Sequence, residues 1–127
     1  MDKRTLLTDF AAALDRLEEA LRQPPASDLI RAGCIQYFEF SFELAWKTVK
    51  VTAEEAGLMD IGSPRTSLRQ AFRQGWIEAE EPWLAMLEAR NRMAHTYTAI
   101  QALRVYDLLP AFAVQLRRLH TALTRLP

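Results

Sequence analysis

The residues from Arg90 to Tyr97 bring an arginine, an amide, a histidine and a phenol together within eight positions. Asn91 and His95 are four residues apart, so a helix would present both on one face. The long Arg90 side chain could bend toward His95 and bind a phosphate between them. Histidine exchanges a proton near neutral pH, and a guanidinium stabilises the charge that grows on a phosphate under attack. These residue types would suit metal-independent cleavage of RNA, in which the ribose 2′-hydroxyl attacks the neighbouring phosphate.

One copy of this cluster has no second acid to protonate the leaving group. A two-fold dimer would supply a second His95 and Arg90 at the same cleft. The same residues also suit a purely structural role. In that interpretation His95 is satisfied by hydrogen bonds within the fold, and the Tyr97 hydroxyl binds a backbone carbonyl at the end of a helical bundle.

Helices must position these residues, because apolar side chains recur every three or four positions along most of the chain. Caps, prolines and glycines mark the helix ends. The predicted helices run from about Leu6 to Leu21, from a Ser27 cap to about Ala56, from a Ser63 cap to Gly75, from Glu80 to about His95 or Thr96, and from a Thr98 cap to the C-terminus. The sequence thus predicts an all-α fold, with residues 1–127 forming one domain. We expect an antiparallel four-helix up-and-down bundle with a short additional helix.

Three details of these helices are also predicted. The second helix carries two adjacent apolar stripes and should be central. Thr98 and Gln101 have the spacing of a capping box, in which each side chain bonds the other residue's backbone. Pro110 removes an intrahelical hydrogen bond and should kink or split the last helix.

Two charged ridges lie on the predicted helices. The first is most simply a solvated face of the second helix and comprises Glu39, Glu43, Lys47 and Lys50. The second recurs at four-residue intervals on the short helix and comprises Arg65, Arg69 and Arg73. These arginines could contact an RNA backbone, although exposed arginines on a short helix also serve ordinary solvation.

The composition excludes several classes of protein. The formal net charge of the 127 residues is zero, which argues against a protein that coats nucleic acid. The single cysteine, Cys34, is expected to pack in the core, and His120 to lie at the surface without a metal partner. We expect no metal and no cofactor. Without a signal-peptide or membrane-spanning segment, the expected location is the cytoplasm.

The chain resembles the HEPN superfamily, specifically the nucleotidyltransferase substrate-binding proteins that include HepT-like toxins. The resemblance covers nearly the whole chain and rests on four segments: Phe38 to Lys47, Gly62 to Arg65, Trp83, and Arg90 to Tyr97. It implies a HEPN-like helical bundle that is encoded beside a minimal nucleotidyltransferase and binds it as a toxin binds its antitoxin. Many members are dimeric, metal-independent ribonucleases.

The resemblance also implies roles for individual residues. Arg90 and His95 would be catalytic, Asn91 would orient them, and Tyr97 would be the hydroxyl to which the partner adds AMP to silence the toxin. Where the family tends to place acidic residues after this tyrosine, the chain has Thr98-Ala99-Ile100. Three hypotheses follow: a ribonuclease toxin, a non-catalytic substrate-binding subunit of a nucleotidyltransferase, and a helical dimerisation protein.

Overall fold

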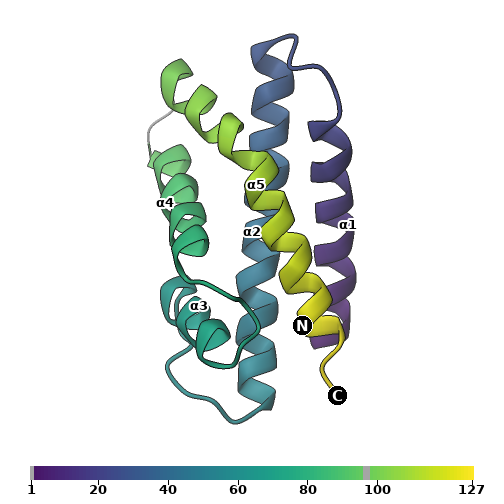
Figure 1. The fold of residues 1–127 in the computed structure, drawn as a ribbon, viewed down its shortest axis with the longest axis vertical. Helices are drawn as coiled ribbons and strands as arrows, with labels where there is room; N and C mark the ends of the chain where they lie inside the picture. Colours follow the sequence, from purple (N-terminus) through teal and green to yellow (C-terminus); the bar gives the residue numbers. More distant parts are fainter. Residues whose placement is uncertain (1, 96–97) are drawn as a thin grey trace.

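The helices form an up-and-down bundle in a computed structural model that describes residues 2–95 and 98–127. Within these residues the elements are α1 Lys3–Leu21, α2 Asp28–Glu55, α3 Pro64–Arg73, α4 Glu81–His95 and α5 Ala99–Thr124. The four long helices alternate in direction, the short α3 lies at the beginning of α4, and both chain termini lie at the same end of the bundle (Figure 1). The predicted all-α bundle is confirmed.

Local chemistry sets the helix ends, as predicted. Ser27, Ser63 and Thr98 are N-caps whose side-chain oxygens each accept a hydrogen bond from a backbone N–H three residues further on. Gly57 and Gly75 follow the caps that close α2 and α3 and have φ values of 74° and 78°. Such left-handed backbone is open to glycine and costly for other residues.

The capping box predicted for α5 is incomplete, and Pro110 bends the helix without splitting it. Thr98 caps the helix, but the reciprocal bond from Gln101 is absent, because the buried Oε1 of Gln101 has no hydrogen-bond partner among the described residues. Pro110 does not split α5, which remains one helix of 26 residues, although its ribbon changes direction along its length (Figure 1). Pro110 is exposed, so water can satisfy the carbonyl that loses its intrahelical donor.

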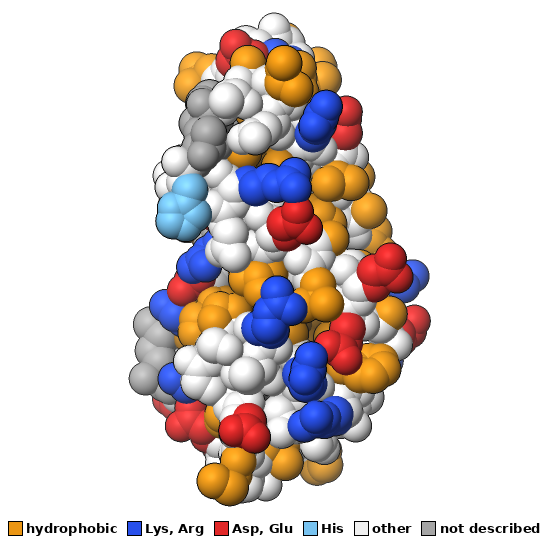
Figure 2. Space-filling view, turned by 90° about the vertical axis from the view of Figure 1, so that its left-hand side faces the viewer, with side chains coloured by type: hydrophobic (Ala, Val, Ile, Leu, Met, Phe, Trp, Pro, Cys, Tyr) orange, Lys and Arg blue, Asp and Glu red, His pale blue; other side chains and the backbone are white. Residues whose placement is uncertain are grey.

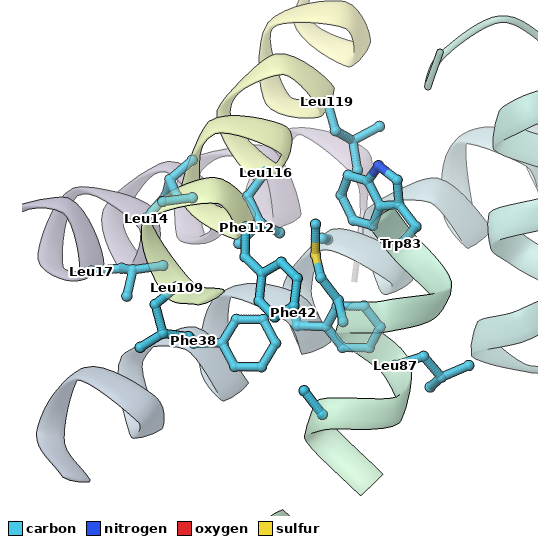
Figure 3. Packing of buried hydrophobic residues seen from close by; sticks show 14 of the residues in the cluster. Leu14, Leu17, Phe38, Phe42, Trp83, Leu87, Leu109, Phe112, Leu116 and Leu119 are labelled. Carbon is cyan, nitrogen blue, oxygen red and sulfur yellow. The ribbon is translucent and has the colours of Figure 1, made fainter. Parts of the chain in front are cut away.

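A chain of aromatic rings joins the helices through the core. Phe38 of α2 stacks on Phe112 of α5 with ring centroids 5.3 Å apart, and Phe42 of α2 lies 6.5 Å from Trp83 of α4. Figure 3 shows these rings between α2, α4 and α5, with leucines of α1 and α5 beside them. Trp83 is completely buried. This packing fixes α4 against the rest of the bundle and so fixes the residues at its end.

The second helix is central, as predicted, because α2 contacts α1, α3 and α5. Its cysteine, Cys34, is only 1% exposed and belongs to the hydrophobic core. Burial raises the pKa of the Cys34 thiol, because a thiolate is poorly solvated there. The expected packing role of this residue is confirmed.

The position predicted for His120 was wrong. Its ring is half-buried between α5 and α1, with Nε2 3.0 Å from the carbonyl oxygen of Leu7. It also meets the Phe10 ring edge-on, with centroids 5.2 Å apart. His120 therefore joins two helices and does not stand free at the surface.

Candidate functional site

The predicted site residues Arg90, Asn91 and His95 all lie in the last two turns of α4. His95 follows Arg90 by five positions, and in a helix of 3.6 residues per turn this places the two side chains about 140° apart. Asn91 and His95 differ by only about 40° and share a face. The structure therefore does not bring Arg90 and His95 of one chain together, and the expectation that Arg90 bends toward His95 is not met.

Arg90 instead points toward the central helix. Its Nη2 donates to Oε2 of Glu43 at 3.0 Å, and its Nη1 donates to Oδ1 of Asn91 at 3.3 Å. Glu43 also accepts from the indole Nε1 of Trp46 at 3.1 Å and lies 3.4 Å from Nζ of Lys47. Trp46 and Lys47 thus help to fix the position of the Glu43 carboxylate, which in turn binds Arg90. The side chains of Arg90 and Glu43 are about one-third exposed, so water screens their attraction only in part.

This contact corrects the interpretation of the ridge on α2 as a solvated face. Glu43 is an anchor for Arg90, and Glu39, one turn before it, is also half-buried. Burial raises the pKa of the Glu39 carboxyl, and the positive charge of Arg90 opposes that shift. Glu43 is the site residue that was not predicted. It lies 47 residues from Arg90, and its local spacing gives no sign of the pairing.

An open groove of about 710 Å³ runs along the outer face of α4. Asn91 and the exposed His95 line one part of it, and Arg65 reaches it from the first turn of α3. Arg69 and Arg73 do not line this groove, and Arg69 lies 4.0 Å from Glu80. Of the three arginines predicted as RNA contacts, only Arg65 lines the groove that also contains His95.

The groove carries both signs of charge. Arg92 pairs with Glu88 one turn away, and Glu81 adds a second carboxylate. Figure 2 shows the side of the molecule formed by α3 and α4, where basic and acidic side chains are interspersed with hydrophobic ones. Exposed ion pairs of this kind contribute little to stability and can be exchanged for contacts with a ligand or a second protein.

Tyr97, the predicted modification site, lies outside the described residues. Within residues 2–95 and 98–127, no three His, Cys, Asp or Glu side chains are grouped where they could hold a metal ion. No helix of the described chain has the length and apolar character needed to cross a membrane.

An up-and-down helical bundle with a polar cluster at the end of α4 is the combination by which we compare this chain with known proteins. Residues 5–125 match the family described as nucleotidyltransferase substrate binding protein like, and the chain belongs to this family.

Two solved structures are close to this chain in shape. A protein of Thermus thermophilus superposes with a TM-score of 0.83 at 29% identity, over 91% of this chain and 99% of the other. A Haemophilus influenzae protein gives the same TM-score at 30% identity, over 94% and 99% of the two chains. That structure is described as revealing the fold of a substrate binding domain of a nucleotidyltransferase.

A curated relative carries a name that refers to activity. It is the "Probable ribonuclease HepT" of Haemophilus influenzae, 35% identical over 92 residues. The alignment covers 69% of this chain and 63% of the relative, so the chain spans less than two thirds of that protein.

Proposed function

We propose that this protein is a metal-independent endoribonuclease of a toxin–antitoxin pair, controlled by a minimal nucleotidyltransferase. The observation that carries the proposal is the open groove along α4 that exposed His95, Asn91 and Arg65 all line. The relative named as a probable ribonuclease supports it. His95 is the proton-transfer group, Arg90 stabilises charge on the phosphate, Asn91 orients Arg90, and Arg65 contacts the RNA backbone.

The reaction needs no external reagent. A base removes the proton of a ribose 2′-hydroxyl, whose oxygen attacks the adjacent phosphorus. The bond from phosphorus to the 5′-oxygen then breaks, and an acid protonates that oxygen. The products are a 2′,3′-cyclic phosphate and a 5′-hydroxyl. Two histidines serve these two proton transfers best, and each chain offers one at the groove.

The direct test uses the wild-type protein produced without its partner. We expect it to slow growth of the host cell and, once purified, to cleave RNA in the presence of EDTA. The cyclic phosphate and 5′-hydroxyl ends of the fragments should be detectable by mass spectrometry.

We predict that the protein forms at least a dimer in solution. Because Arg90 and His95 of one α4 point about 140° apart, a phosphate can meet both groups most simply when the two come from different copies. Light scattering at micromolar concentration should give at least twice the mass of one chain. A clean monomer would contradict a shared cleft.

We also predict that Tyr97 accepts AMP from the partner nucleotidyltransferase. The residue follows His95 by two positions, so a modified tyrosine would bring a phosphate and a purine to the end of the groove. The added negative charge would oppose RNA binding and the base would occupy its space. Co-expression with an active partner should add one or more AMP masses to the intact protein, and Tyr97→Phe should abolish them. Identical spectra with and without an active partner would leave Tyr97 with a structural role.

A specific observation favours a second candidate function. Arg90 is already engaged by Glu43 and Asn91, as expected for an arginine that holds α4 against α2. With this role, the protein would be a non-catalytic subunit that presents substrate to a nucleotidyltransferase, in keeping with the family description. A plain helical dimerisation protein is the third candidate, and it gives no reason for the exposed histidine in the groove.

A further inference from the structure

A second hollow lies between the loop that joins α3 to α4 and the last turns of α5. Its volume is about 460 Å³, within the range of roughly 300 to 1,000 Å³ that is typical of small-molecule sites. It shares no lining residue with the groove that contains His95.

The hollow has an apolar floor and an aromatic wall. Trp83 and Leu119, which are 0% and 1% exposed, form part of the floor, and the small Ala122 leaves space above them. Trp76 is half-buried in the wall. Its backbone N–H donates to the carbonyl oxygen of Ala71 at 2.9 Å, which ties the indole-bearing residue to the end of α3. An aromatic ring held in this way is a surface on which a planar group can stack.

Arginines line the side formed by α5. Arg118 and Arg125 are two helical turns apart, about 10 Å along the axis, with Ala122 between them. Neither belongs to an ion pair within the described residues. Arg117 also lines the hollow, but Asp15 and Glu18 already engage its guanidinium. The hollow therefore offers two guanidinium groups to an anion, against the single carboxylate of Glu78.

We propose that this hollow binds a nucleotide. The base stacks on Trp76 above the apolar floor, and the phosphate accepts hydrogen bonds from Arg118 and Arg125. The Glu78 carboxylate can accept from the ribose hydroxyls. A free nucleotide and the terminal nucleotide of an RNA strand present the same chemistry. This inference does not depend on ribonuclease activity at His95.

Titration of isotopically labelled protein with 5′-AMP, observed by NMR, tests the proposal. The chain has three tryptophans, and their indole N–H signals can be assigned from Trp→Phe variants. We expect the Trp76 signal to shift at nucleotide concentrations below about 1 mM, while the Trp46 signal stays in place. Adenosine and inorganic phosphate should each bind more weakly than AMP, because each provides half of the recognised chemistry. A single-stranded RNA hexamer that binds more tightly than AMP would assign the site to RNA.

Matched variants separate this site from general attraction between charges. The double variant Arg118→Gln with Arg125→Gln should weaken AMP binding at least about tenfold, whereas Arg4→Gln with Arg22→Gln removes the same charge from α1 and its C-cap and should leave binding intact. His95→Ala should also bind AMP normally. An unmoved Trp76 signal, equal binding by phosphate alone, or equal losses in the two double variants would each overturn the proposal.

Discussion

His95→Ala is expected to reduce RNA cleavage by about 10²- to 10⁴-fold, the range for loss of a proton-transfer group. Arg90→Ala should reduce it by about 10²- to 10³-fold, because the charge on the phosphate loses its cation. Both variants should also lose the ability to slow growth. The measurement is the initial rate of cleavage of a labelled RNA in EDTA, with circular dichroism to show that the helices remain.

The second histidine provides the control for this experiment. His120 bonds the Leu7 carbonyl and lies outside the groove, so His120→Gln should keep its cleavage rate even if it loses some stability. If RNA cleavage survives His95→Ala, the proposed proton transfer by His95 is wrong. A wild-type protein that is inert toward a broad panel of RNAs would favour the substrate-binding subunit instead.

The largest expected effect on stability comes from Trp83→Ala, which should lower the free energy of unfolding by about 3 to 5 kcal/mol. Trp83 is completely buried and fixes α4 through its contact with Phe42. Domains of ordinary stability unfold with only about 5 to 15 kcal/mol, so this variant should lose a large share of the stability of the domain. Urea denaturation followed by circular dichroism measures the change.

An exposed aromatic residue gives the matched comparison. Phe40 is 50% exposed on α2, so Phe40→Ala should change the free energy of unfolding by no more than about 0.5 kcal/mol in the monomer. If Trp83→Ala cost less than about 1 kcal/mol, the ring could not be the support of α4 that the packing indicates.

The helices were predictable because their ends depend on neighbouring residues. Ser27, Ser63 and Thr98 bond backbone groups only three residues away, so a short stretch of sequence contains the whole interaction. The course of α5 was less predictable. Its buried face packs along the bundle on both sides of Pro110, and this tertiary packing outweighs the loss of one hydrogen bond in a turn open to water.

The site was predictable in its residue types and less so in its geometry. The helical period alone separates Arg90 from His95 by about 140°, but the flexible arginine side chain leaves its direction open until a partner is known. That partner, Glu43, is distant in the sequence and sits on a ridge that has the pattern of a solvated face. Arg65 shares a groove with His95 only because α3 packs against α4, a long-range arrangement that no local pattern contains.

The contact between Arg90 and Glu43 means that a side chain of the protein itself competes with any anionic ligand for Arg90. A carboxylate presents oxygens to a guanidinium much as a phosphate does, so Glu43 occupies Arg90 as an anionic ligand would. Any incoming anion must displace it, and the effective concentration of a tethered carboxylate is high. Isolated phosphate and chloride ions are therefore poor rivals for Arg90. A polyanion makes several contacts with the protein at once, and these can offset the loss of the contact between Arg90 and Glu43. Arg90 would therefore favour ligands that carry many linked negative charges over single anions.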